Sequence, residues 1–160
     1  MNDTTYKSSD NKFSVELNDM ILKNIKSECI KARDKETGGI LFGNYSINGK
    51  NAILSSITGP PKDSRRTACR FIIINVTELN AKIDYKWKQG HYYIGEWHFH
   101  PHSRPKPSIL DDLQMKKNSI DELLKCPEPI LLIIGGDQEN GWELSLHVYT
   151  KDDKVTLIKE

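Results

Sequence analysis

Residues 92–112 read YYIGEWHFHPHSRPKPSILDD, and this stretch decides how the surrounding chain is organised. The aromatic and apolar residues of Tyr92–His100 predict a β-strand, which Pro101 stops. Residues 101–107 contain three prolines, which remove backbone donors and fix φ, so regular structure is excluded there. A helix is then expected from about Ser108 to at least Lys117. The order is therefore strand, irregular loop and helix.

The N-terminal half shows one clear helix among several short strands. Asn18 is a suitable N-cap, and Leu17, Ile21, Ile25 and Cys29 recur every four residues, which predicts an amphipathic helix ending near Arg33. The other elements expected here are strands at 13–17, 40–42, 52–57 and 69–74, a turn at Asn48-Gly49, a loop at Lys62–Thr67, and a helix that starts at Asn75 or Thr77 and ends at Gly90.

The C-terminal third indicates a hairpin. The helix after Ser108 either continues to Lys125 or breaks at Asn118-Ser119. Ile130–Ile134 and the alternating Trp142–Tyr149 then form two strands, and Val155–Ile158 is expected as an edge strand. We expect an α/β (α+β) fold with a mixed, curved β-sheet flanked by two or three helices. It forms a single domain over residues 13–160, and residues 1–12 form a disordered tail.

Composition excludes several classes of protein. The 160 residues carry 23 Lys+Arg against 22 Asp+Glu, a net charge of +1, which does not fit a dedicated nucleic-acid binder. The longest apolar run is Ile130–Ile134, far short of the ~20 residues that span a bilayer, and no secretory signal is visible. Three scattered cysteines without a CxxC pair indicate reduced thiols and a cytoplasmic protein. We expect neither nucleic acid nor a membrane as a partner.

The chemistry concentrates at two histidines and an aspartate. His98 and His100 lie two residues apart on the predicted strand, so their side chains share one face about 6.6 Å apart. Asp111 arrives in the first turn of the following helix. Two histidines and one carboxylate can bind zinc and leave a fourth position open for water. Each part also has a purely structural explanation: surface histidines on a strand, and a helix cap in the Ser108–Asp111 pattern.

Two neighbouring residues compete for the same roles. His102 can serve as a third ligand, but Pro101 breaks the alternation that would align it, so Asp111 ranks higher. Asp112 is expected to point toward solvent. In the second informative segment, KETGGILFG at residues 35–43, Glu36 precedes a glycine pair and a short strand. Taken alone, Glu36 is a surface carboxylate at a helix end.

The joint pattern resembles the JAMM (MPN-plus) metalloprotease family over about residues 13–158. The residues that carry the resemblance are Glu36, His98, His100, Pro101, Ser108 and Asp111. The resemblance implies a cytidine-deaminase-like architecture and one zinc ion per chain, bound by His98, His100 and Asp111. It also implies that Glu36 transfers the proton and that Ser108 stabilises the oxyanion. The reaction implied is hydrolysis of the amide or isopeptide bond after the C-terminal tail of a ubiquitin-like protein.

The chain departs from the familiar eukaryotic pattern in two ways. Phe99 stands between the histidines where many relatives have Ser or Thr, and the large insertions of specialised deubiquitinases are missing. The chain is most similar to bacterial JAB deconjugases, above all those of cyclic-oligonucleotide anti-phage (CBASS) operons. Such a protein would work with E1/E2-like transfer enzymes and a cGAS-like nucleotidyltransferase.

Three alternatives remain open at this point. The same site can process sulfur-carrier proteins of ubiquitin fold, or the domain can be a metal-free interaction scaffold of the MPN-minus type. A nucleic-acid module built on Arg65, Arg66 and Arg70 is weaker, because these arginines lie in a short charged segment without interleaved aromatic residues.

Overall fold

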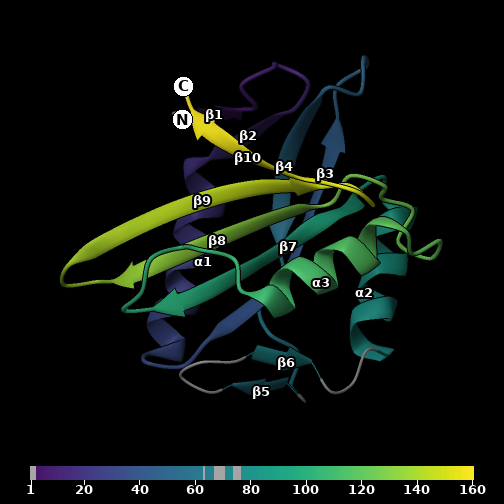
Figure 1. Ribbon diagram of the computed structural model, residues 1–160. Helices are drawn as coiled ribbons and strands as arrows, with labels where there is room; N and C mark the ends of the chain where they lie inside the picture. The colour runs from purple at the N-terminus through teal and green to yellow at the C-terminus, as the bar shows by residue number, and fades with distance from the viewer. Residues whose placement is uncertain (1–2, 63, 67–70, 74–76) are drawn as a thin grey trace.

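The computed structural model describes residues 3–62, 64–66, 71–73 and 77–160 (Figure 1). The helices are α1 (Asp19–Ala32), α2 (Thr77–Lys88) and α3 (Ile109–Ser119). The strands are β1 (Asp3–Lys7), β2 (Ser14–Asn18), β3 (Thr37–Tyr45), β4 (Asn51–Ile57), β5 (Ser64–Arg66), β6 (Phe71–Ile73), β7 (Tyr92–Pro101), β8 (Ile130–Asp137), β9 (Gly141–Tyr149) and β10 (Lys154–Lys159). Helix and strand are therefore mixed along the chain as expected.

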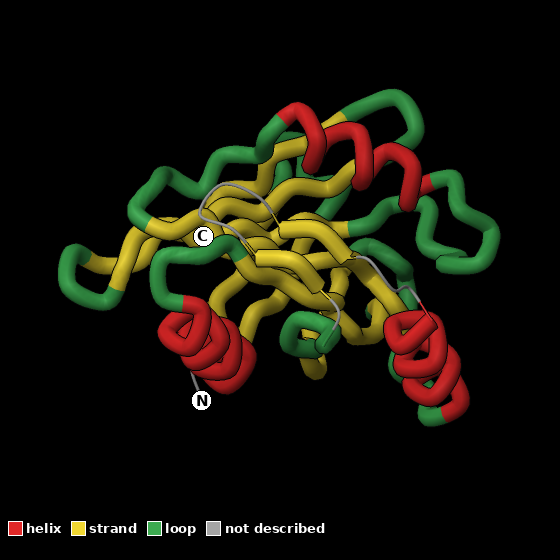
Figure 2. Tube along the Cα trace, turned by 90° about the horizontal axis from the view of Figure 1, so that it is seen from below, coloured by secondary structure: helices red, strands yellow, loops and turns green. Residues whose placement is uncertain are grey.

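Eight of the strands close into a barrel, in the order β1-β10-β9-β8-β7-β3-β4-β2. The pairs β2–β4 and β7–β8 are parallel, and the other neighbours are antiparallel. The expected mixed, curved sheet flanked by helices is therefore wrong, and so is the cytidine-deaminase-like architecture derived from the resemblance. Figure 2 shows the helices arranged around these strands.

The strand β1 is responsible for the closure. It pairs with β2 through five residue pairs from Asp3↔Asn18 to Lys7↔Ser14, and with β10 through Tyr6↔Lys159 and Lys7↔Ile158. We expected a disordered tail over residues 1–12, but the structure places a strand there. The pairing uses backbone groups and one buried side chain, Tyr6, so the sequence of this segment has little of the hydrophobic pattern by which a strand is predicted. Because β10 pairs with β1 as well as with β9, it is not the edge strand that we expected.

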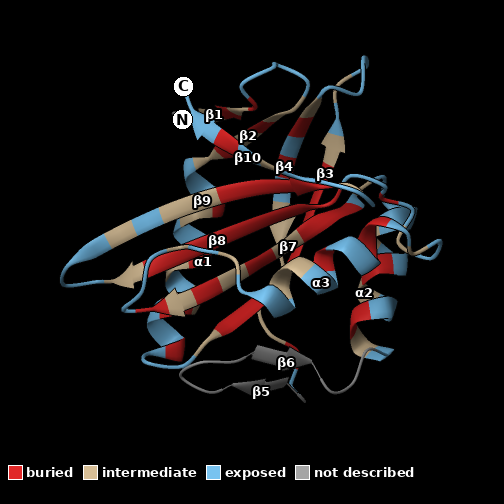
Figure 3. Cartoon of the chain, in the orientation of Figure 1, coloured by how far each residue is buried: buried red, intermediate tan, exposed pale blue. Residues whose placement is uncertain are grey.

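The two faces of the central strands belong to different core clusters. Figure 3 shows that these strands, β7 and β8, are largely buried. On β8, Ile130, Leu132 and Ile134 pack in the cluster that contains α1, whereas Leu131 and Ile133 pack with Met115 of α3. On β7, Trp97 and Phe99 also belong to the α1 cluster. Because side chains alternate along a strand, Glu96, His98 and His100 must project from the opposite face, toward α3.

Side-chain contacts anchor α3 over this face of the sheet. Asp112 accepts a hydrogen bond of 2.6 Å from the hydroxyl of Tyr149 and one of 3.0 Å from Lys154 Nζ. Met115 is fully buried at the centre of the helix. The helix ends at Ser119, so of the two alternatives the structure has the break at Asn118-Ser119 and not the continuation to Lys125. Asp112 therefore points into the strands β9 and β10, not to solvent as expected.

Several smaller expectations can be compared with the structure. Asn18 caps α1 by accepting a hydrogen bond of 2.9 Å from the backbone N–H of Ile21, as predicted. The segment expected as a loop at Lys62–Thr67 contains β5, which pairs with β6. Cys69, Arg70 and the alternative cap Asn75 lie outside the described residues. None of the helices in the described part of the chain is long and apolar enough to cross a membrane.

Candidate metal centre

The strand β7 presents one half of the site. It is held on one side by β3, where Gly38 pairs with His98, and on the other by β8, where Ile133 pairs with His98. The side chains of His98 and His100 are 13% and 14% exposed. Both imidazoles are therefore largely shielded from water.

The contact between β3 and β7 requires glycine at position 39. A Cβ atom on Gly39 would lie 2.1 Å from the carbonyl oxygen of Thr58 and 2.8 Å from Trp97 Nε1. These two atoms are hydrogen-bonded to each other, since the indole N–H of Trp97 donates to the Thr58 carbonyl over 2.9 Å. The glycine pair noted in the sequence thus lets the strand that follows Glu36 approach the histidine strand closely.

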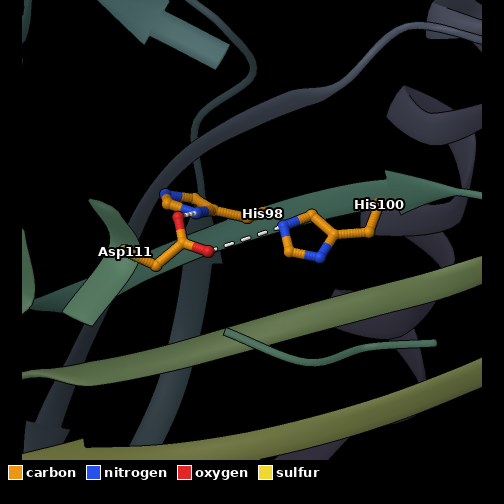
Figure 4. Close-up of side chains that lie close together, drawn as sticks. All are labelled: His98, His100 and Asp111. Carbon is orange, nitrogen blue, oxygen red and sulfur yellow. Dashed lines mark hydrogen bonds and ion pairs between the residues drawn. The ribbon is translucent and has the colours of Figure 1, made fainter. Parts of the chain in front are cut away.

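The helix α3 supplies the other half of the site through Asp111 (Figure 4). Its Oδ1 lies 2.9 Å from His98 Nδ1, and its Oδ2 lies 3.6 Å from His100 Nε2. The side chain is 12% exposed. A single carboxylate therefore faces both histidines from across the gap between strand and helix.

The first turn of α3 holds this carboxylate in place. Ser108 is the N-cap, and its hydroxyl accepts a hydrogen bond of 3.1 Å from the backbone N–H of Asp111. In return, Asp111 Oδ2 accepts one of 2.7 Å from the backbone N–H of Ser108. This reciprocal capping box satisfies two N–H groups at the helix start. Helix capping and an inward-facing Asp111 are thus present together, and neither excludes the other.

Together the three side chains form a group that can hold a metal ion. One donor atom from each of His98, His100 and Asp111 lies within 4.8 Å of the other two. Two imidazole nitrogens and one carboxylate oxygen suit a transition-metal ion better than calcium or magnesium, which are bound mainly by oxygen atoms. The donor set is therefore chemically suited to a metal of the zinc type.

In the metal-free protein, His98 and Asp111 form an ion pair. Burial lowers the pKa of His98, but the hydrogen bonds and charges of Asp111 and Glu96 outweigh it and raise the value to about 9. Burial raises the pKa of Asp111, but its hydrogen bond with His98 and the charge of that imidazolium lower it to about 2. Burial also lowers the pKa of His100. The metal-free protein thus holds a proton on His98 at neutral pH.

Glu36 and His102 are placed differently with respect to this group. Glu36 is half-buried and comes directly before β3, in which Thr37 pairs with Phe99, so extending the register by one residue places Glu36 opposite His100. His102 is turned away instead: its Nε2 lies 2.7 Å from Asp34 Oδ1, and its Nδ1 lies 3.0 Å from Asp137 Oδ2. The structure therefore brings Asp111, not His102, to the two histidines.

The family model for prokaryotic homologues of the JAB domain matches residues 21–147, which include all of the residues just described. The chain belongs to this family. The sequence resemblance to JAMM proteins is therefore confirmed at the level of the family, and the JAB domain occupies most of the chain.

Individual relatives agree with this assignment. This JAB domain is 34% identical over 158 residues to a CD-NTase/cGAS isopeptidase of Enterobacter hormaechei, with 99% of this chain and 87% of that protein covered. A probable metalloprotease of Sinorhizobium fredii is 27% identical over 120 residues, which cover 67% of this chain and 66% of that protein. The fold is similar to a solution structure of a protein from Desulfitobacterium hafniense, with a TM-score of 0.63, 19% identity, and coverage of 89% and 87% of the two chains.

Sequence reasoning missed one side chain of the JAB domain site. Glu96 shares the face of β7 with the two histidines, and its Oε2 lies 3.2 Å from His98 Nε2. The strand alternation that identified His98 and His100 also pointed to position 96, two residues earlier. Arg65 and Arg66 lie on β5, which forms a separate two-stranded sheet with β6.

Proposed function

We propose that this JAB domain is a zinc metallopeptidase of the isopeptidase type, with one zinc ion per chain. The observation that carries the proposal is the convergence of His98, His100 and Asp111, contributed by two separate elements, on one place. Protein zinc sites use these donor types, and catalytic sites combine three protein ligands with an open position. A zinc ion bound there would lower the pKa of a bound water to about 7 and polarise the scissile carbonyl.

The residues around the cluster supply the remaining chemistry in this proposal. Glu36 accepts a proton from the attacking water and later delivers it to the leaving amine nitrogen. The hydroxyl of Ser108 donates a hydrogen bond to the oxygen that becomes negatively charged as the water oxygen adds to the carbonyl carbon. The carbon–nitrogen bond then breaks and gives a carboxylate and a free amine. Ser108 would serve this step in addition to capping α3.

The proposed substrate is a protein conjugate. Three relatives are named CD-NTase/cGAS isopeptidases, from Enterobacter hormaechei, Vibrio cholerae and Pseudomonas aeruginosa. We infer an amide or isopeptide bond after the C-terminal tail of a ubiquitin-like protein, in a conjugate related to a cGAS-like nucleotidyltransferase. The protein would then reverse the work of E1/E2-like transfer enzymes in the cytoplasm of a bacterium with a CBASS-type anti-phage system.

The test compares cleavage and metal content in the same variants. The substrate is a cGAS-like nucleotidyltransferase joined to a second protein by an isopeptide bond, and cleavage is followed on gels. Glu36→Gln should keep its zinc and lose at least about a hundredfold in rate, because a positioned general base contributes 10²–10⁴-fold. Asp111→Asn should lose both zinc and cleavage. Asp84→Asn, at an exposed aspartate on α2, is the matched control and should keep both.

Two other results would replace this function with an alternative. If the protein cleaves only C-terminal extensions of sulfur-carrier proteins, the function of the same site is the processing of precursors. Purified protein that binds no zinc after reconstitution would indicate a metal-free scaffold. Full activity of Glu36→Gln would remove this carboxylate from the mechanism while leaving the metal site intact.

A further inference from the structure

Glu96 uses both of its carboxylate oxygens inside the molecule. Oε2 lies 3.2 Å from Nε2 of His98, on the opposite side of the imidazole ring from the nitrogen that faces Asp111. Oε1 accepts a hydrogen bond of 2.8 Å from Nδ2 of Asn118. The side chain of Glu96 is only 19% exposed. A carboxylate that is so far removed from water needs such partners, because an unpaired buried charge is costly.

Asn118 is itself fixed in orientation. It lies in the last turn of α3 and is 5% exposed. Its Oδ1 accepts a hydrogen bond of 2.8 Å from Gln114 Nε2, while its Nδ2 donates to Tyr93 Oη over 3.0 Å as well as to Glu96. The amide therefore cannot turn over without losing these partners. A buried polar chain runs from α3 through Asn118 and Glu96 to His98 on β7.

We propose that Glu96 is the positioning residue of the metal site: it holds the imidazole of His98 and increases its strength as a ligand. A histidine that binds metal through one ring nitrogen commonly donates its other N–H to a carboxylate, which fixes the ring and makes it more basic. Glu96 occupies the place of that carboxylate. This inference rests on the metal site of the proposed function, and it adds a residue that does not itself contact the metal.

A purely structural role for Glu96 is the main competitor, since the residue also ties β7 to α3. Two variants separate the roles. In Glu96→Gln, the side-chain amide can take two orientations. In one, its N–H₂ faces the N–H₂ of Asn118, and in the other, its N–H₂ faces the N–H of His98. Either orientation places two hydrogen-bond donors against each other. In the double variant Glu96→Gln with Asn118→Asp, the glutamine N–H₂ can donate to the new carboxylate, and its oxygen can still accept from His98.

The measurement is Co²⁺ affinity by competition with a coloured chelator, together with the visible spectrum of the bound Co²⁺ and the melting temperature of the metal-free protein. At pH 9.5, where a proton on His98 competes little with the metal ion, Glu96→Gln should bind Co²⁺ about 10–100-fold more weakly than the wild type, the usual effect of removing such a partner. The double variant should recover its melting temperature but not its affinity, because His98 then faces a neutral amide. Glu122→Gln, an exposed carboxylate on the loop after α3, is the charge-matched control and should match the wild type.

The outcomes separate this inference from the proposed function. A double variant that recovers both melting temperature and affinity would make Glu96 structural only. A spectrum showing that Glu96→Gln loses a ligand would make Glu96 a metal ligand and overturn its positioning role. Wild-type affinity in Glu96→Gln would overturn this inference alone, whereas a wild-type protein that binds no Co²⁺ would overturn the metal site on which both depend.

Discussion

A metal ion bound at the proposed site would compete directly with the proton on His98, and the size of this competition follows from the structure. In the metal-free protein the pKa of His98 is about 9, because its hydrogen bonds with Asp111 and Glu96 outweigh the effect of burial. His100, with its lowered pKa, is neutral above pH 7, and Asp111, with a pKa of about 2, is already ionised. Raising the pH from 7 to well above 9 therefore removes a single proton from the three side chains.

The magnitude is a factor of about one hundred. At pH 7 roughly one molecule in a hundred has neutral His98, which corresponds to about 2.7 kcal/mol of binding free energy, at about 1.36 kcal/mol per pH unit. The apparent affinity for Co²⁺ should therefore rise nearly tenfold between pH 7 and 8, more slowly around pH 9, and become constant well above pH 9. At pH 7, binding should also release about one proton per metal ion.

Two measurements check this prediction. Competition with a chelator whose own protonation is known gives the affinity between pH 6.5 and 9.5, and a dye in weakly buffered solution reports the released protons. His102→Gln is the control, because His102 also has a raised pKa, caused by Asp34 and Asp137, but lies outside the cluster. It should leave the slope unchanged. An affinity that stays flat from pH 7 to 8.5 would show that His98 is neutral in the metal-free protein and would refute the reasoning.

Three further predictions concern stability and the helix that carries the aspartate. In the metal-free protein, the ion pair of His98 and Asp111 should stabilise the fold most between pH 3.8 and 6.5. This stabilisation is lost as the pH rises through the pKa of His98, about 9, and also as the pH falls through the pKa of Asp111, about 2. Denaturant titrations at pH 5 and 9.5 should show the difference. Ser108→Ala should lower the free energy of unfolding by about 1 kcal/mol, because it removes the N-cap of α3, and it should also reduce cleavage. Ser108→Asn should restore stability, because asparagine also caps helices, without restoring cleavage. Unreduced cleavage in Ser108→Ala would limit the hydroxyl to capping. Gly39→Ala should cost at least about 1–3 kcal/mol, because its Cβ meets the backbone oxygen of Thr58 at 2.1 Å; an unchanged melting temperature would contradict this tight packing.

The meeting of His98, His100 and Asp111 was predictable because it follows from two local rules. The alternation of side chains along a strand places His98 and His100 on one face, and the capping pattern at Ser108 places Asp111 in the first turn of the next helix. The irregular segment between them brings the helix back over the strand. All three steps depend on residues that are close in sequence, and the structure confirms that the three side chains meet.

The closure of the sheet was not predictable in this way. β1 joins two strands through backbone hydrogen bonds, and only Tyr6 of its five residues is buried, so no apolar pattern marks it. Glu96 was missed for a related reason. A carboxylate between apolar neighbours on a strand usually faces water, and its partner Asn118 lies 22 residues away on a helix whose position the sequence does not reveal.

The closing strand also has a consequence for synthesis on the ribosome. β1 can form its hairpin with β2 early, but its other edge meets β10, and the ion pair Lys7–Glu160 joins residues 153 positions apart. Until β10 has emerged, a nascent chain therefore presents an open edge with unpaired N–H and C=O groups, which can pair with another chain. Folding of this domain ends with its last strand, and the interval before that step is when it is most exposed to aggregation and most dependent on chaperones.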